Sequence, residues 1–490
     1  MVRAVTRNMR LATVALALLP LCAALAATAQ PAPPGAAEQR DMQRLGHHDL
    51  HGRGASWPVV HNQGGRWLAY VGHHGGQRPN LLTGRPEWNG TSILDVTDPR
   101  NPAYLAHIPG APGEAEAGGA PMARVCGGKD LPGGAAGKTY LLRTLGPRAH
   151  EVWDVSEPRR PARLATVLDG LDGTGRGWWE CRTGIAYLVA DGRPSGWRTA
   201  RMTKIYHLAD PASPRFVRDF GLPGQEPGAT GPVPAGVQGA IAHQGRVYFA
   251  YAGGPAGGLQ IVDRDRLLQG DPRASARLAP TSESLVFPQV GRLEMPPEWG
   301  GQTSFPVLDV PVPDFAASGR GRERDLVVLV AGAPRNECQE ARALTFLVDV
   351  TTVSRPVPVS SYQVPESAGG FCGRGGRFGP HASNESFTPV YYGRLVFLAY
   401  GNAGVRAVDI RDPFHPREVA HFVPATTPAT ARRCVTVGGA ERCKVAVQTS
   451  GVEVDDRGLI YLADGADTGL HIVELSGAAR EIPRQPREGL

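Results

Sequence analysis

Three stretches of the chain repeat one pattern: an apolar run, an acidic residue, a turn that contains two prolines, and a second run. They are GTSILDVTDPRNPAYLAHI from Gly90, HEVWDVSEPRRPARLATV from His150 and AGVRAVDIRDPFHPREVAHF from Ala403. Prolines such as Pro99 and Pro102 fix φ and lack an amide donor, so they end a strand. Each copy therefore predicts a strand, a tight reversal and a returning strand.

The repetition extends over most of the chain. An apolar run that precedes the repeated pattern appears as GKTYLLRT, GIAYLVAD, GRVYFAYA, GRLVFLAY and GLIYLADG. The strands that end at the turn finish on Asp95, Asp154, His207, Asp263, Asp349, Asp409 and Glu474. The 63 glycines, the 44 prolines and the near absence of helical periodicity favour an all-β protein. Seven copies that cannot bury their faces alone predict a seven-bladed β-propeller of four-stranded antiparallel blades.

These units resemble the LVIVD-repeat family of secreted β-propellers. LIYLADGADTGLHIVEL, VFLAYGNAGVRAVDIRDP and TSILDVTDP carry the resemblance, which covers most of residues 45–480. The resemblance implies the fold and gives almost no information about activity. Two units depart from the pattern: one has His207 in place of the aspartate, and another reads IVDRDRLLQGDP without the two-proline turn.

The chain begins with a basic segment, a short apolar run and the small-residue site Ala27-Thr28-Ala29, which predicts a signal peptide over residues 1–29. We expect a flexible segment over 30–44, a single propeller over 45–482 and a tail over 483–490. The favoured closure of the ring packs whole blades together, with AREIPRQ as the last outer strand. In the alternative, DMQRLGHHDL pairs into the last blade.

Charge and cysteine content narrow the class of protein. Loss of Arg3, Arg7 and Arg10 with the signal peptide lowers the formal net charge from +6 to +3, and the basic residues are scattered, which argues against a nucleic-acid surface. No later apolar run is long enough for a membrane span. Six cysteines remain in a predicted secreted or periplasmic protein. The expected disulfides are Cys434–Cys443 and Cys338–Cys372, while Cys126 and Cys181 form a third or stay as thiols.

Histidines suggest a site at the mouth of the ring. In this strand order, the loops that precede first strands share a face with the loops between second and third strands. Those loops contain His51, His73, His74 and His381, with His47, His48 and His150 nearby. Imidazoles bind transition metals, so one hypothesis is a copper or zinc site. A short likeness to selenium-binding and methanethiol oxidase propellers implies copper. In the alternative, these histidines are solvated or anchor loops.

Other residues give weaker indications. Trp178 and Trp179 suit stacking on a ligand, or packing between blades. The repeated aspartates are interpreted as turn residues. No phosphate-binding loop or nucleophile elbow is present.

The function that these patterns favour is a monomeric binding or scaffolding protein. Its ligand would be a protein or small molecule on the loop face of the ring. The alternative is a metal-dependent oxidoreductase or hydrolase that uses the four histidines, with Glu385 as proton acceptor.

Overall fold

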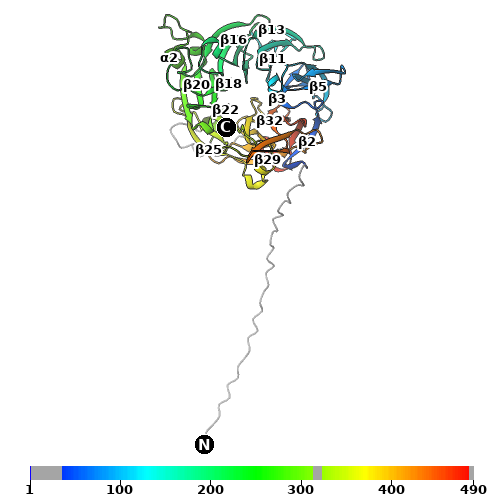
Figure 1. Cartoon of the computed structure of the whole chain (residues 1–490). Helices are drawn as coiled ribbons and strands as arrows, with labels where there is room; N and C mark the ends of the chain where they lie inside the picture. The colour runs from blue at the N-terminus through cyan, green and yellow to red at the C-terminus, as the bar shows by residue number, and fades with distance from the viewer. Residues whose placement is uncertain (2–35, 313–322, 485–490) are drawn as a thin grey trace.

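The computed structural model describes residue 1 and residues 36–312 and 323–484. The predicted signal peptide, apart from its first residue, and the tail beyond residue 484 lie outside this part. The described chain is built almost entirely from antiparallel sheets that follow one another around a ring (Figure 1). None of its helices is long and apolar enough to cross a membrane.

Five sheets are formed in chain order, each around a path of four strands, and the first sheet also holds a fifth strand, β9 (Ala115–Ala120). Their strands are β3 (Ala55–Gln63), β4 (Arg66–Gly75), β7 (Thr91–Asp95) and β8 (Ala103–Ile108) in the first; β10 (Ala123–Gly127), β11 (Thr139–Leu145), β12 (Ala149–Asp154) and β13 (Ala162–Leu168) in the second; β14 (Trp178–Glu180), β15 (Ile185–Ala190), β16 (Met202–His207) and β17 (Arg215–Phe220) in the third; β18 (Gly236–His243), β19 (Arg246–Ala252), β20 (Gly257–Asp263) and β21 (Gln289–Met295) in the fourth; and β22 (Gly301–Pro311), β23 (Glu323–Ala331), β24 (Thr345–Asp349) and β25 (Val357–Tyr362) in the fifth.

The remaining long strands form one nine-stranded sheet. It contains β26 (Phe378–Ser383), β27 (Leu395–Gly401), β28 (Val405–Asp409), β29 (Arg417–Val423) and β1 (Glu38–Arg40), followed by β32 (Thr449–Val454), β33 (Ile460–Asp464), β34 (Gly469–Leu475) and β2 (Met42–His48). The pair Gly401–Thr449 alone joins β27 to β32, so we call the two parts on either side of this pair the sixth and seventh units.

Short elements decorate the sheets. They are β9 (Ala115–Ala120) beside β4, the hairpins β5 (Gln77–Asn80) with β6 (Arg85–Trp88) and β30 (Arg432–Val437) with β31 (Ala440–Val445), the helices α1 (Arg264–Gln269) and α2 (Ser282–Val286), and the 3-10 turns η1 (Gly128–Asp130), η2 (Arg193–Ser195), η3 (Pro297–Trp299), η5 (Glu366–Ala368), η6 (Phe371–Gly373) and η7 (Gly477–Arg484).

The first strands of the sheets lie against one another in a closed circle. Going around it, β3 contacts β10, and contacts continue through β14, β18, β22, β26 and β32, which contacts β3 again. The first strand of every unit therefore lines the ring centre, and the fourth lies at the outside.

The N-terminal strands close this circle. Strand β2 pairs with β34 from Met42–Leu475 to His48–Leu470, and β1 pairs with the outer strand β29. Figure 1 shows blue β2 beside the orange-red C-terminal strands. The predicted closure by packing alone is wrong, because residues 477–484 form η7 instead of an outer strand. The predicted flexible segment is also wrong for residues 38–44, whose backbone groups are bonded into the sheet.

The repeated aspartates stabilise the turn after the third strand. The side chains of Asp95, Asp154, Asp349 and Asp409 each accept a hydrogen bond from the amide two residues later, at 2.8–3.1 Å. In the fourth sheet, Asp263 instead accepts from the Arg266 amide and begins helix α1. Two helices thus replace the two-proline turn there, which accounts for part of the longest spacing between copies.

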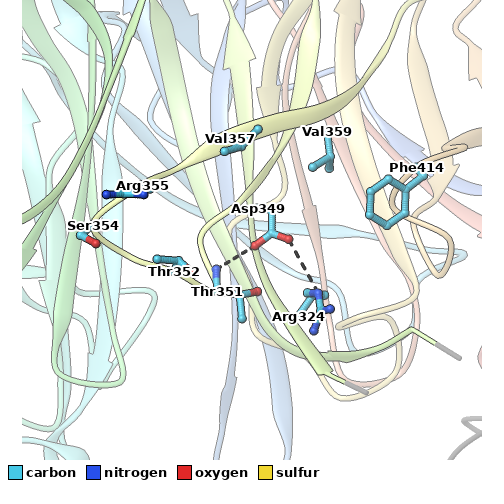
Figure 2. A pocket seen from close by; sticks show the side chains of 9 residues that line it. All are labelled: Arg324, Asp349, Thr351, Thr352, Ser354, Arg355, Val357, Val359 and Phe414. Carbon is cyan, nitrogen blue, oxygen red and sulfur yellow. Dashed lines mark hydrogen bonds and ion pairs between the residues drawn. The ribbon is translucent and has the colours of Figure 1, made fainter. Parts of the chain in front are cut away.

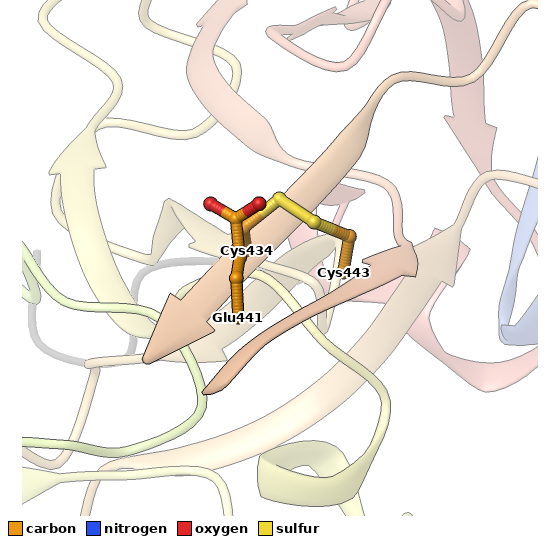
Figure 3. Close-up of side chains that lie close together, drawn as sticks. All are labelled: Cys434, Glu441 and Cys443. Atoms are coloured by element: carbon orange, nitrogen blue, oxygen red, sulfur yellow. A yellow bond between two sulfur atoms is a disulfide. The ribbon is translucent and has the colours of Figure 1, made fainter. Parts of the chain in front are cut away.

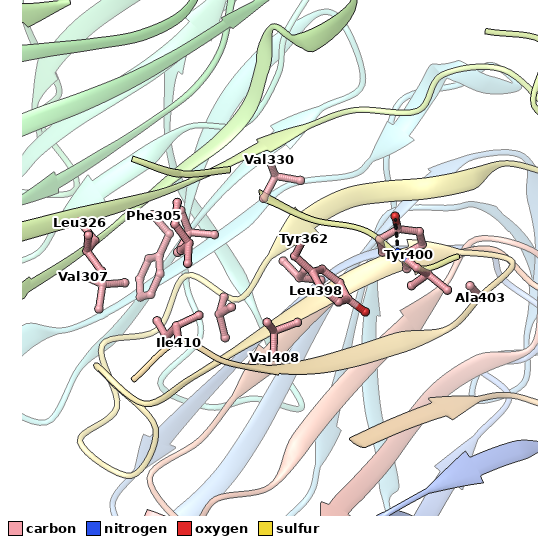
Figure 4. Close-up of a cluster of buried hydrophobic side chains, with 14 of the residues drawn as sticks. Phe305, Val307, Leu326, Val330, Tyr362, Leu398, Tyr400, Ala403, Val408 and Ile410 are labelled. Atoms are coloured by element: carbon pink, nitrogen blue, oxygen red, sulfur yellow. Dashed lines mark hydrogen bonds between the residues drawn. The ribbon is translucent and has the colours of Figure 1, made fainter. Parts of the chain in front are cut away.

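Apolar side chains between neighbouring sheets form the core. Figure 4 shows one such cluster, in which Phe305 and Leu326 of the fifth sheet face Leu398 and Val408 of the sixth unit, all nearly fully buried. Burial at roughly 25 cal/mol per Å² of apolar surface makes these contacts the main source of stability. Each sheet therefore depends on its neighbours around the ring.

All three disulfides join the predicted partners. Cys126 pairs with Cys181, Cys338 with Cys372, and Cys434 with Cys443. The open alternative for the first pair, free thiols, is therefore replaced by a bridge between the second and third sheets. The last pair spans the hairpin β30–β31.

Candidate functional site

Charged and aromatic side chains meet where the first strands surround the ring centre. Five first strands, or the residues next to them, supply these side chains: β3, β10, β14, β26 and β32. We call the set the ring-centre cluster: Trp57, Arg124, Arg176, Trp178, Glu385 and Glu453.

Arg124 occupies the middle of the cluster. Its Nη2 donates a hydrogen bond to Glu385 Oε2, and its Nε donates to the Gly177 carbonyl at 2.9 Å. Its guanidinium carbon lies 5.0 Å from the ring centroid of Trp178 and 5.9 Å from that of Trp57. The ion pair is almost fully buried, with side-chain exposures of 9% and 4%. Such a charge pair is costly to break, because either partner would be left uncompensated.

Arg176 is a second buried cation in the same place. Its guanidinium lies over Trp57 at 4.5 Å, and its Nη1 is 3.9 Å from Glu385 Oε1, too far for a hydrogen bond. Burial lowers the pKa of Arg176 to about 10, against the attraction of Glu385 and with the repulsion of Arg124. The residue stays positively charged at neutral pH.

Glu453 adds a carboxyl group with an altered affinity for protons. Burial raises the pKa of Glu453 to about 7, and the charge of Glu385 acts in the same direction. Hydrogen bonds from the amides of Ser386 and Val454, at 3.1 and 2.9 Å, oppose this shift. The net charge of the cluster therefore changes near neutral pH.

Aromatic rings pack beside the cluster, around Phe387. The ring of Phe387 stacks on His243 with centroids 4.1 Å apart and lies 5.1 Å from Phe305. Trp178 meets it edge-on at 6.2 Å. Since His243 ends β18 at the edge opposite the predicted mouth, these rings pack on that side of the charged groups.

Toward the mouth, the ring-centre cluster is followed by a group that we call the mouth group: His74, Glu116, Arg377 and His381. His381 Nδ1 donates to the Ser450 carbonyl at 2.6 Å, and burial together with the charge of Arg176 lowers its pKa to about 3. His74 Nδ1 lies 3.5 Å from Glu116 Oε2. Two of the four predicted metal ligands, His74 and His381, belong to this group, and after burial the charge of His74 is a minor cause of the lowered pKa of His381.

The other two predicted ligands, His73 on β4 and His51 in the turn before β3, are held by other partners. His73 is fully buried, with Nδ1 3.1 Å from the Gly54 carbonyl and Nε2 2.7 Å from Ser92 Oγ. Since a carbonyl only accepts, Nδ1 is the donor and Nε2 accepts the Ser92 hydroxyl proton, so both ring nitrogens are occupied. The His51 ring packs on Tyr104 of outer strand β8 at 4.2 Å. The predicted convergence of the four histidines is therefore wrong.

The secondary candidates also separate. His47, on outer strand β2, donates from Nε2 to the Thr468 carbonyl at 2.6 Å. His48 stacks on Tyr104 with ring centroids 5.3 Å apart. His150 is buried between the second and third sheets, bonded to the Val189 carbonyl at 3.0 Å. Trp179 fills the core between the same sheets, as one interpretation predicted. Glu385 and Trp178 alone among these lie at the ring centre.

One group of possible metal ligands is brought together in the described residues. It consists of Cys434, Glu441 and Cys443 (Figure 3). The two cysteines form a disulfide, so no thiolate is present to bind an ion.

A pocket of about 660 Å³ lies away from the ring centre, beside the turn after β24. Figure 2 shows its lining, which includes Arg324, Asp349, Arg355 and Phe414. Asp349 accepts from the Thr351 amide and pairs with Arg324 at 3.9 Å. We place the candidate site at the ring centre instead, because two charged groups of this pocket, Arg324 and Asp349, pair with each other at one of the repeated turns.

Sequence reasoning missed four residues of the ring-centre cluster: Trp57, Arg124, Arg176 and Glu453. A signal for two of them was present, since Arg124 and Glu453 are single charged residues within the otherwise uncharged runs PMARVCG and SGVEV. A charge in a predicted inner strand indicates either a pair or a binding site.

Comparison with known proteins bears on the fold. No protein-family model and no curated protein matches the chain. The structure is similar to that of Raptor from Chaetomium thermophilum, with a TM-score of 0.51 and 10% identity over 89% of this chain. The match covers 30% of the Raptor chain. Sqt1 from Saccharomyces cerevisiae gives a TM-score of 0.44 and 9% identity, covering 88% of this chain and 98% of Sqt1. The similarity to Raptor concerns the fold alone.

Proposed function

We propose that this chain is a secreted or periplasmic seven-bladed β-propeller of the LVIVD-repeat type that binds a small ligand at its ring centre. The closed circle of first strands supports the blade count, because the nine-stranded sheet divides into two four-stranded units at the pair Gly401–Thr449. Secretion is supported by the basic and apolar N-terminal pattern and by three disulfides, which persist in oxidising compartments.

The observation on which the binding proposal depends is the ring-centre cluster. Its side chains come from five blades, which are far apart in the sequence, and they do not repeat from blade to blade. Burying two guanidinium groups and two carboxyl groups is costly for a scaffold that needs only apolar packing. A few polar groups placed among aromatic side chains are typical of ligand-binding sites.

A thermal-shift screen tests this proposal. The wild-type protein is heated with four compound classes, namely sugars, amines, carboxylates and phosphates. We expect one class to raise the unfolding temperature. The rise should be smaller in Trp57→Phe, which keeps an aromatic ring but loses the indole N–H. The matched control is Trp299→Phe, since Trp299 packs on Phe346 of the fifth sheet.

The two variants show whether the shift in unfolding temperature arises from a ligand at the ring centre. A shift that is reduced by Trp57→Phe and unchanged by Trp299→Phe supports a ligand site at the ring centre. If no class gives a shift that depends on Trp57, the proposed function is wrong.

A further inference from the structure

Three buried N–H donors of the ring-centre cluster have no acceptor among the described residues. They are Arg176 Nη1, Trp57 Nε1 and Trp178 Nε1. Trp57 is 2% exposed, and the side chain of Arg176 is 10% exposed. A buried donor without a partner costs about 1–3 kcal/mol, so three in one place call for a common acceptor.

The three donors belong to one compact arrangement. Arg176 lies over the Trp57 ring, and both indoles lie within 6 Å of the Arg124 guanidinium. Glu385 contacts both arginines, through a hydrogen bond to Arg124 and a 3.9 Å approach to Arg176. The carboxylate of Glu385 is thus used by Arg124, while Arg176 keeps unsatisfied hydrogen-bonding capacity.

The charges of the cluster favour an anion. Two guanidinium groups face one carboxylate that is engaged in a hydrogen bond, and Glu453 is a weaker acid than an exposed glutamate because it is buried. Arg201, whose Nε donates to the Val237 carbonyl at 3.0 Å, adds a further positive charge near Arg176. A cationic ligand would meet repulsion here.

We propose that the ring-centre cluster binds the carboxylate group of a small ligand through Arg176 Nη1 and the indole N–H groups of Trp57 and Trp178. A carboxylate is planar and offers two acceptor oxygens, which match a guanidinium fork and fit beside flat indole rings. A tetrahedral phosphate directs its oxygens out of any such plane. This inference rests on the proposed function and specifies the chemical class of the ligand.

Calorimetric titration tests the ligand class with named probes. Acetate and benzoate are titrated into the full mature protein at constant ionic strength set with chloride, in parallel with inorganic phosphate and tetramethylammonium. We expect the carboxylates to bind, and we expect Arg176→Gln to weaken binding by about 10- to 100-fold, because a charge-assisted hydrogen bond is lost. Trp57→Phe, which removes one neutral donor, should weaken it by about 2- to 10-fold.

Two controls keep the result interpretable. Arg182→Gln removes an exposed arginine from the same stretch of sequence and should leave carboxylate binding unchanged. Arg176→Lys keeps the charge and loses the planar fork, so it covers the case in which Arg176→Gln does not fold. Circular dichroism verifies the fold of each variant.

The outcomes separate this inference from the proposed function. Carboxylate binding that depends on Arg176 supports the inference. Preference for phosphate, for the ammonium cation or for sugars found in the thermal-shift screen would overturn it and leave the proposed function intact. If no probe binds and no class passes the screen, the unpaired donors are satisfied by ordered water only, and both fail.

Discussion

The outer turns and the ring centre of this protein follow different rules. At the outer turns, one arrangement recurs: the aspartates at the ends of four third strands all accept a hydrogen bond from the amide two residues later. At the ring centre, the residues differ from one first strand to the next, with Trp57 on β3, Arg124 on β10 and Glu453 on β32.

In a repeat fold, recurring and non-recurring positions have different roles. A residue that recurs at equivalent positions meets the same surroundings in every blade, so its role is to make the blade. A residue that breaks the recurrence at an inner position has surroundings of its own, and here these include buried charges. Function in such a ring is therefore expected at the positions that do not repeat.

The largest effect should come from breaking the inner ion pair. Arg124→Met leaves the Glu385 carboxylate buried without its hydrogen-bonded partner, which should lower the free energy of unfolding by about 3–5 kcal/mol. The matched outer variant is Arg163→Met on β13, whose side chain is 57% exposed and pairs with Glu151 at 3.2 Å. This exposed cation should be worth about 0–1 kcal/mol. Urea denaturation monitored by circular dichroism measures both.

A double variant tests whether the loss of stability at the inner position comes from the uncompensated charge of Glu385. Adding Glu385→Met to Arg124→Met removes the stranded charge, so stability should partly recover. Equal losses in Arg124→Met and Arg163→Met would contradict the view that the inner pair is special.

Much of the fold could be predicted from the sequence, because the repeated turns are local. The prolines and aspartates of each copy determine a reversal within a few residues, so the third strands end where the sequence indicated, at Asp95, Asp154 and Asp409. The Cys434–Cys443 pair could be predicted for the same reason, because only 9 positions separate the two cysteines. The closure by β2 could not be read locally, since the fit of Met42 against Leu475 depends on the finished ring.

The candidate site was predicted less well, because side-chain direction at the ring centre is a tertiary property. The sequence predicted a metal site of four histidines. In the structure the His73 ring is hydrogen-bonded to Ser92, and the His51 ring packs on Tyr104. Arg176 could not be identified from the sequence, because its position over the Trp57 ring depends on how the two chain segments meet in the folded ring. The predicted site lay in the loops at the mouth, whereas the ring-centre cluster lies on the first strands or next to them.

The next effect concerns two glutamates whose pKa values are shifted in opposite directions. Inner Glu453 has a pKa raised from 4.5 to about 7 by burial. The folded state therefore holds a proton that the unfolded state releases, so stability falls as pH rises from about 5 to 7. Glu453→Gln should remove this loss and stabilise the protein at pH 8 by about 1–3 kcal/mol.

Outer Glu418 supplies the control with the opposite sign. Burial disfavours its ionisation, but hydrogen bonds from His421 and Tyr362 and the charge of Arg406 outweigh this and lower its pKa to about 2. Its contribution is present above pH 4.5 and lost as pH falls toward 2, so Glu418→Gln should destabilise at pH 8. Urea midpoints at pH 5 and pH 8 report Glu453→Gln, and midpoints at about pH 3 and pH 8 report Glu418→Gln. The same pH slope in wild type and Glu453→Gln would show that Glu453 does not titrate as described.

The smallest effect should come from a single repeated turn. Asp95 accepts from the Thr97 amide at 3.0 Å and from Arg66 Nη2 at 2.8 Å, and the side chain of Arg66 is 48% exposed. Asp95→Ala removes both contacts and should cost about 1 kcal/mol, whereas Asp95→Asn keeps an acceptor for the amide and should cost less. Urea midpoints of the two variants separate the turn bond from the ion pair. Asp95→Ala should lower the free energy of unfolding much less than Arg124→Met. Equal losses would contradict the view that a repeated turn stabilises its own surroundings only, whereas the inner ion pair stabilises the whole ring.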